Sequence, residues 1–458
     1  MIPSAFRAFA HSLPAAVLSA AVAAQVPDGY IVFGTFATGS AFQGVYFAHP
    51  RDTSAAPIAV TNLPADLANL GTGSHGVAAL ARRASDGAIL AGERAPAGAS
   101  VDFWVLRLVG STVTLAQSFS CGTSAGVGEI PQFGQLPDGR IVIAATDLQP
   151  GGQLAHFFNN GGYNWQGLSI LNPVSGAFST VPVSNWGSFT GVMNGMAVAA
   201  DGATIWLGEY ISTTSGSLWQ IPVTGGTAVL AAQLPFGASN VAVDSDGTVL
   251  VTTLNGPPNL FRYDPVGTTL QPIPTSTGAL NAVAVETVTG NFVMATANAG
   301  VPARSLVWRT PAGPDNVLLT PGLSTISSLD LNPNPESYGV GSPGAASYAW
   351  RLAPNPGGLP LAGSSTFSLT VGASVATTAP GLFAIGFAAS PPISVFGITV
   401  LVDPSSVVVL GTVLADTATL PVPLTAGPGL IGLQLFVQGI FLEPNTFVAS
   451  PGVSFTVL

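Results

Sequence analysis

Asn194 opens the segment NGMAVAADG, in which an apolar, strand-like run begins with a side chain that could bind a ligand or a metal. Other polar residues precede or open comparable runs, namely His75, Glu129, Asn240, Asn281 and Ser327. If these runs lie around a common axis, their side chains form a ring that is polar and mostly uncharged. Such a ring suits a small polar ligand held by hydrogen bonds better than a divalent cation, which prefers several charged oxygen ligands.

Nucleophilic chemistry has little support in the sequence. GTSAG at 122–126 has the Gly-x-Ser-x-Gly pattern of a nucleophile elbow, but that motif needs a strand-to-helix turn, and no helical pattern follows it. The chain has four histidines, of which His11 would leave with an N-terminal signal. Cys121 is the only cysteine and is expected to be a small buried side chain. We therefore expect no catalytic residue and no cofactor.

A second candidate for binding is the aromatic segment HFFNNGGYNWQG at 156–167. Its Asn and Gly residues favour a surface loop, and Tyr163 and Trp165 could form a stacking platform for sugar rings or for a partner protein. The alternative is that these rings pack between neighbouring structural repeats. The sequence favours the packing interpretation, and binding by the loop is kept as a hypothesis.

The elements that would position these residues are short strands. Turn signals recur every 43 to 63 residues, at Asp28-Gly29, Asp86-Gly87, Asp138-Gly139, Asp201-Gly202, Asp246-Gly247 and Thr289-Gly290. Each turn is followed by three strand-like segments, and all but the first are preceded by one more. The missing strand is found in ISSLDLN at 326–332, which we expect to pair with 30–36 and close a ring. Repetition at this period predicts a propeller of six four-stranded blades.

The segments NGMAVAADG, NVAVDSDGTVLVTTLNGPPNLFRYDP and NAVAVETVTGNFVMATA resemble blades of NHL-repeat and regucalcin/gluconolactonase-type six-bladed β-propellers. The resemblance covers roughly residues 28–336 and implies a fold rather than an activity. The resemblance to the lactonases implies a divalent cation held by a Glu, an Asn and an Asp. Asn194 matches the Asn, but Ser239 and Asn240 stand where the Asp should be, and Glu129 lies one blade later than the Glu. We therefore expect no metal site.

The repeat pattern ends in a Pro-, Gly- and Ser-rich stretch at 332–345. We expect a signal at 1–24, the propeller at 25–336, a linker at 337–345 and a β-sandwich at 346–458. The last segment is similar to a C-terminal domain of secreted planctomycete-type proteins, although Ser342 replaces the usual cysteine of a Cys-Pro-Gly. The resemblance implies an accessory or surface module without an agreed activity. Its phenylalanines in apolar runs are expected in the core, namely Phe367, Phe383, Phe387, Phe396 and Phe436.

Composition limits location and partners. The N-terminus has Arg7, an apolar stretch and small residues before Gln25, which is typical of a secretory signal rather than a membrane span. We expect an exported protein, periplasmic or at the cell surface, without an integral membrane segment after cleavage. The formal charge is −10 with no basic stripe, so nucleic acid is not an expected partner.

These observations favour an all-β, non-enzymatic binding or interaction protein whose partner is a small polar ligand, a glycan or a protein. Two alternatives stay open: a lactonase-like, metal-dependent hydrolase and a carbohydrate-binding protein. The fold alone does not decide between these functions.

Overall fold

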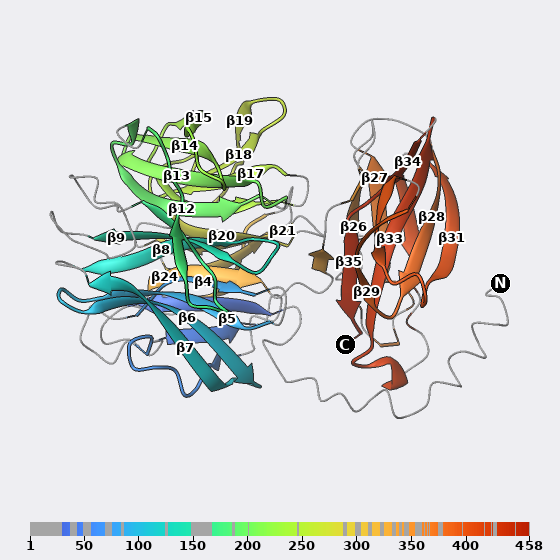
Figure 1. Ribbon diagram of the computed structural model, residues 1–458, viewed down its shortest axis with the longest axis horizontal. Helices are drawn as coiled ribbons and strands as arrows, with labels where there is room; N and C mark the ends of the chain where they lie inside the picture. The colour runs from blue at the N-terminus through green and yellow to red at the C-terminus, as the bar shows by residue number, and fades with distance from the viewer. Residues whose placement is uncertain are drawn as a thin grey trace.

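In the computed structural model, the helices and strands of the described residues are almost all β-strands, arranged as a propeller and a C-terminal domain (Figure 1). The residues that it describes are 30–36, 44–48, 56–68, 76–83, 87–123, 127–147, 167–185, 188–199, 201–244, 247–286, 291–297, 304–309, 314–320, 325–331, 336–338, 341–342, 348–352, 360, 362–363, 365, 367–373, 379–395, 397–415, 417–422, 424, 428–444 and 446–457.

The propeller has six antiparallel blades, each with four strands running from the inner to the outer edge. Blade 1 contains β24 (Thr325–Leu331), β1 (Ile31–Phe36), β2 (Gly44–Ala48) and β3 (Ile58–Ala59). Blade 2 contains β4 (Gly76–Arg82), β5 (Ile89–Ala95), β6 (Ser100–Val109) and β7 (Thr112–Thr123). Blade 3 contains β8 (Gly128–Gln135), β9 (Ile141–Asp147), β10 (Leu168–Leu171) and β11 (Phe178–Thr180).

The other half of the ring repeats this order. Blade 4 contains β12 (Val192–Val198), β13 (Thr204–Ser212), β14 (Ser215–Pro222) and β15 (Val229–Leu234). Blade 5 contains β16 (Ala238–Val243), β17 (Val249–Thr253), β18 (Leu260–Asp264) and β19 (Thr269–Pro272). Blade 6 contains β20 (Leu280–Glu286), β21 (Asn291–Thr296), β22 (Leu306–Arg309) and β23 (Asn316–Leu319).

The predicted closure of the ring is confirmed. β24 is the inner strand of blade 1 and pairs antiparallel with β1, from Ile31 opposite Leu331 to Phe36 opposite Thr325. Without β24, β1 would present an open edge of backbone N–H and C=O groups. The last propeller strand therefore completes the first blade, so both ends of the domain are fixed in one sheet.

The propeller core lies between the blades. The second strand of a blade, such as β17, is buried along its whole length. Its sequence is therefore a continuous apolar run rather than an alternation of apolar and polar residues. One buried cluster joins blades 1 and 2, for example Phe47 with Leu106, and another joins blades 6 and 1, for example Val293 with Phe33. Each fully buried aliphatic or aromatic side chain contributes about 1.5–3 kcal/mol, so the ring is held mainly by apolar contact between blades.

The C-terminal domain contains two main sheets and a hairpin. The larger sheet has β25 (Glu336–Tyr338), β35 (Gly452–Thr456), β33 (Gln434–Glu443), β28 (Ala379–Gly386) and β31 (Val408–Ala415), with β34 (Thr446–Ala449) also paired to β33. The smaller sheet has β26 (Tyr348–Leu352), β27 (Ser368–Ala373) and β32 (Thr417–Pro421). The hairpin is β29 (Ala389–Val395) and β30 (Ile398–Val402), and a 3₁₀ turn spans Pro428–Leu430.

The two main sheets contribute side chains to one buried cluster. Phe367, beside β27, and Phe455, on β35, meet edge to face with ring centroids 5.0 Å apart, and Phe383 is fully buried in the same core. Phe387 was expected in this core, but it is 41% exposed because it follows the end of β28 in a bend. Phe436 is partly buried, and Phe396 lies outside the described residues.

The division between the domains differs from the expected linker. Residues 336–338 form β25, which pairs with β35, and Ser342 forms a bridge with Ala449. The second domain therefore begins before residue 346. Composition did not reveal this strand because it joins the sheet through backbone hydrogen bonds in a stretch with the residues of a linker.

Candidate functional site

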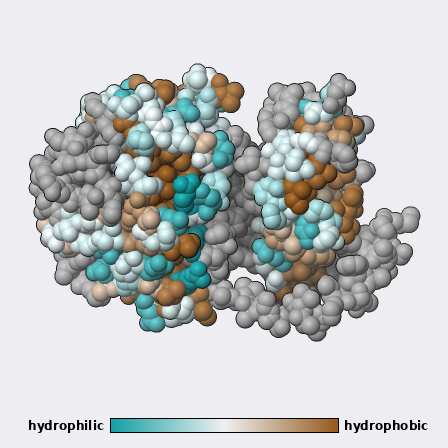
Figure 2. Space-filling model, viewed as in Figure 1, coloured by the Kyte–Doolittle hydropathy of each residue, from teal (hydrophilic) through white to brown (hydrophobic). Residues whose placement is uncertain are grey.

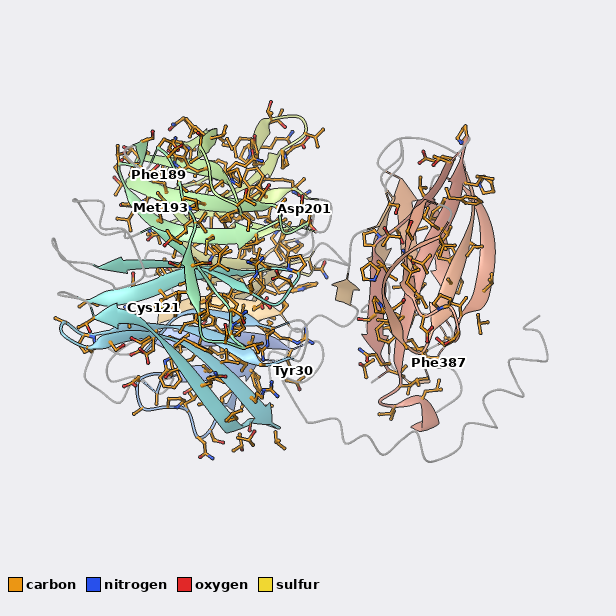
Figure 3. All side chains as sticks on the ribbon, in the orientation of Figure 1. Tyr30, Cys121, Phe189, Met193, Asp201 and Phe387 are labelled. Carbon is orange, nitrogen blue, oxygen red and sulfur yellow. The ribbon has the colours of Figure 1, made fainter. Side chains whose placement is uncertain are left out.

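The inner strands of all six blades begin at the same end of the central channel, which we call the channel mouth. Each inner strand pairs its first residues with the last residues of the second strand, as in Gly128 opposite Asp147 and Val192 opposite Tyr210. Met193, near the start of β12, and Asp201, in the turn after it, mark the two ends of blade 4 in Figure 3. His75 directly precedes β4 but lies outside the described residues.

Every inner strand has a β-bulge close to the channel mouth. At this point the register with the second strand shifts, and one or two residues of the inner strand have no partner opposite them. In blades 1 to 6 these residues are, in order, Ser327, Ala78, Ile130 with Pro131, Asn194, Ser239 and Asn281. A bulge changes the direction of its side chain, which aims these residues at the neighbouring blade.

At four of the six blade interfaces the bulge side chain donates a hydrogen bond to the next inner strand. The acceptor is each time the carbonyl oxygen of the residue before the next bulge. The pairs are Asn194 Nδ2 to Ala238 O at 3.4 Å, Ser239 Oγ to Leu280 O at 2.6 Å, Asn281 Nδ2 to Ile326 O at 3.1 Å, and Ser327 Oγ to Val77 O. We call this series the bulge ladder.

The bulge ladder has a structural purpose. An inner strand has no neighbouring strand on its channel side, so its backbone groups there need other partners. The ladder satisfies one carbonyl per interface, and each such bond contributes a net 0.5–1.5 kcal/mol, roughly. The predicted ring residues Asn194, Asn281 and Ser327 therefore belong to the joints between blades.

Asn240 differs from the expected arrangement. The bulge residue of blade 5 is its neighbour Ser239, while Asn240 is 5% exposed and accepts a hydrogen bond from Val283 N through Oδ1 at 3.3 Å. The bulge shifts the strand by one residue, which reverses the faces of the residues that follow it. Asn240 therefore joins blades 5 and 6 from a buried position rather than lining the channel mouth.

Blades 2 and 3 are joined in another way. Their bulge residues Ala78, Ile130 and Pro131 have no side-chain donor, and β5 instead pairs directly with β8. Arg94 and Glu129 face each other in this pairing and form an ion pair of 3.5 Å. Burial raises the pKa of Glu129, against the opposing effect of the Arg94 guanidinium. Glu129 is thus engaged with a cation from the neighbouring blade.

Two buried glutamates near the channel mouth were not found from the sequence. Glu209, on β13, accepts hydrogen bonds from Thr190 N, Gly191 N and Trp219 Nε1, each at 2.7 Å. Its carboxyl group thus fixes the connection that leads into β12. The signal was a Gly-Glu pair in LGEY with a tryptophan on the next strand, and it recurs in blade 2.

The equivalent residue in blade 2 is Glu93, in AGER. It accepts hydrogen bonds from Trp104 Nε1 and Asp102 N, each at 3.2 Å. Burial, with a smaller effect of the Asp66 and Asp102 charges, raises the pKa of Glu93 to about 8, against the lowering effect of the Trp104 hydrogen bond. The two equivalent positions therefore differ in their hydrogen-bond donors.

The opposite end of the channel carries charged residues. Asp330, near the end of β24, accepts hydrogen bonds from Arg82 N at 2.7 Å and Leu331 N at 2.8 Å. Burial raises its pKa to about 6. Asp244, which directly follows β16, is buried and forms an ion pair with Arg262 at 3.5 Å.

The donors suggested for a metal are engaged in these contacts. The Asn194 amide donates to a backbone carbonyl, and the Glu129 carboxylate faces Arg94. Within the described stretches, no three His, Cys, Asp or Glu residues are grouped closely enough to hold a metal ion. The four histidines, His11, His49, His75 and His156, all lie outside those stretches.

The remaining sequence candidates fall partly outside the described residues. Gly122 and Thr123 of GTSAG end β7, and residues 124–126 are not described. Cys121 is fully buried, as expected, and burial raises the pKa of its thiol. Tyr163 and Trp165 lie in the segment 148–166, which is also not described. In the described part of the chain, no helix is long and apolar enough to span a membrane.

Comparisons with known proteins give distant structural neighbours only. No protein-family model matches the chain, and no curated protein matches it. TolB from Acinetobacter baumannii is 14% identical with a TM-score of 0.45, and the match covers 67% of each chain. A putative 6-phosphogluconolactonase from Bacteroides fragilis is 10% identical with a TM-score of 0.41, covering 66% of this chain and 98% of that one.

A gluconolactonase from Xanthomonas campestris is 14% identical with a TM-score of 0.37, and the match covers 61% of this chain and 91% of that one. Similarity at this level does not assign an activity. The propeller assignment rests on the blades and the ring closure themselves.

Proposed function

We propose that this protein is an exported, non-enzymatic binding protein that contacts its ligand at the channel mouth of the propeller. The observation that carries the proposal is the bulge ladder, in which side chains at the positions that could hold a metal join the blades instead. A ring joined in this way is a rigid scaffold, and loops on a rigid scaffold can bind with little loss of conformational entropy.

Strand β9 ends at the channel mouth, and the aromatic segment follows it in the sequence. Residues 148–167 connect β9 to β10, and Asp147, the last residue of β9, lies opposite Gly128 at the start of β8. We propose that Tyr163 and Trp165 supply the stacking surface, and that His75, Glu129, Asn194 and Asn281 border it. The ligand is then a glycan or another partner with flat, polar faces.

A lactonase-like activity is the second candidate, and the NHL-type and gluconolactonase-type resemblance of the blades motivates it. The donor set gives it less support, because the Glu129 carboxylate is neutralised by Arg94 and the position expected for an Asp has Ser239 and Asn240. Hard cations bind best where several uncompensated oxygen ligands meet.

The binding proposal is tested on a glycan array with the mature chain and with the Tyr163→Ala/Trp165→Ala double variant. We expect the wild type to bind a restricted set of glycans and the double variant to lose that binding while its melting temperature stays nearly unchanged. Asn316→Ala, on the outer strand of blade 6, is the control and should bind as the wild type does. Hydrolysis of gluconolactone by the wild type without glycan binding would favour the second candidate.

We also propose that the C-terminal domain is an accessory or surface module of the exported protein. Apolar patches are exposed on the face of this domain seen in Figure 2. The exposed side chains of the domain as a whole include Phe387, Leu442 and Phe447. Mass spectrometry of protein secreted from an expression host should find a mature N-terminus at Gln25. An intact N-terminus in the cytoplasmic fraction would contradict export.

A further inference from the structure

The outer strand of blade 2 differs from the outer strands of the other blades. β3, β11, β19 and β23 have two to four residues and β15 has six, whereas β7 has twelve. β7 and its partner β6 form a long hairpin at the lower edge of the propeller in Figure 1. The other blades provide a comparison within the same molecule, because most of their outer strands are too short to pair with another strand.

The middle of β7 is exposed on both faces. The five consecutive residues 114–118, with the sequence TLAQS, are all exposed, whereas Val113 and Phe119 on either side are buried. β7 contains no charged residue and no proline. Natural edge strands are usually protected from pairing by charge, proline or shortness, and β7 has none of these protections.

Among the described residues, the outer edge of β7 forms backbone hydrogen bonds with another blade only at its start. Thr61 N donates to Ser111 O at 2.8 Å, and Val113 N donates to Thr61 O at 3.0 Å. Beyond this bridge, β7 is the last strand of its sheet among the described residues. From Thr114 to Ser118, no described strand pairs with the outer edge of β7, and the side chains there are uncharged.

The lack of charged residues in β7 allows a second copy of this acidic chain to approach at this edge. The chain has a formal charge of −10 and contains no lysine, so two copies repel each other wherever acidic side chains meet. An uncharged strand permits approach without burying an unpaired charge. An antiparallel strand pair can also be symmetric about a two-fold axis, so β7 is complementary to itself.

We propose that two copies of this chain form a homodimer by antiparallel pairing of β7 through residues 114–118, with Ala116 at the two-fold axis. The pairing extends the eight-stranded sheet of blades 2 and 3 into the sheet of the partner. A contact of five residues on each side is small, so the dimer is weak and depends on concentration.

The test is sedimentation equilibrium of the mature full chain, from low micromolar to several hundred micromolar, for the wild type and two variants. Ala116→Lys places two ammonium groups beside each other at the axis, and it should raise the dimer dissociation constant about tenfold or more. Ala59→Lys, on the exposed edge strand β3 of blade 1, is the matched control and should leave the dimer unchanged. Thermal unfolding of each variant verifies that the propeller is folded.

Hydrogen exchange gives a second, independent readout on the wild type. Amides of residues 114–118 should exchange more slowly at high than at low concentration, while those of β15 should not change. A monomer at every concentration overturns the proposal. So does a dimer that Ala116→Lys leaves intact, or one that both variants weaken equally, because its contact would lie elsewhere.

Discussion

At the residue scale, two carboxyl groups at equivalent positions of the repeat have different surroundings. Glu209 receives three N–H donors from two different segments, and it holds the entry to β12. Glu93 receives two donors and lies near other carboxylates, and its pKa is raised to about 8. The same residue type therefore has a different role in each blade, set by its neighbours.

Replacing these residues with glutamine should separate the two roles. In Glu209→Gln an amide NH₂ replaces an oxygen that accepts N–H donors, which should cost about 2–3 kcal/mol of unfolding free energy. Glu93→Gln resembles the neutral form that already predominates at pH 7, so it should cost less than about 1 kcal/mol. Urea unfolding at pH 7 measures both values. Equal losses in the two variants would contradict this account.

Stability should decrease as pH rises. The folded protein binds protons at Glu93 and Asp330 more tightly than the unfolded chain, because burial raises the pKa of Glu93 from 4.5 to about 8 and that of Asp330 from 3.8 to about 6. The stabilising contribution is therefore present below pH 4 and is lost between there and pH 8. The melting temperature should be higher at pH 5 than at pH 9, and Glu93→Gln should reduce the difference. A wild-type melting temperature that rises toward pH 9 would contradict the prediction.

At the scale of elements, the repeated bulges explain what the sequence could and could not predict. The period of turns and apolar runs predicted the inner strands and the closing strand, because both depend on the alternation of buried segments and turns. This pattern did not predict the bulges, because a bulge is defined by the register between two strands and not by a residue type. The bulge residues include Ala78, Pro131 and Asn281, which share no chemical property.

Within the bulge ladder, the shorter and more buried hydrogen bonds should contribute more to the free energy of unfolding. Ser239 is 8% exposed and lies 2.6 Å from Leu280 O, whereas Asn194 is half-buried and lies 3.4 Å from Ala238 O. Ser239→Ala leaves a buried acceptor without this donor and should cost about 1–3 kcal/mol, and Asn194→Ala should cost less than about 1 kcal/mol. Urea unfolding ranks the two variants, and the reverse order would show that the bonds do not join the blades as described.

At the scale of the whole molecule, composition predicted two β domains, and the structure moves the start of the second to β25. The Pro- and Gly-rich stretch was visible in the sequence, whereas the pairing of β25 with β35 depends on residues more than one hundred positions apart. Composition also could not show which apolar side chains stay exposed. Phe387 lies in an apolar run, yet the end of β28 leaves it at the surface.

The two domains should fold independently if the cut respects the observed strands. Residues 25–332 and 333–458 each contain complete sheets and their own buried clusters. Each fragment should be soluble when expressed alone and should unfold in one cooperative transition. A second domain cut at residue 346 loses β25 and should be less stable than one cut at 333. Aggregation of both fragments from a soluble full chain would indicate a large apolar contact between the domains.

Polar side chains at the channel mouth join the blades, and we infer that they do not hold a metal ion. Titration calorimetry of the mature chain with CaCl₂ and with ZnCl₂, for the wild type and Asn194→Ala, tests this inference. We expect only weak, non-stoichiometric heats, the same in both proteins and typical of an acidic surface. Stoichiometric micromolar binding that Asn194→Ala abolishes would contradict it and would favour the lactonase-like function.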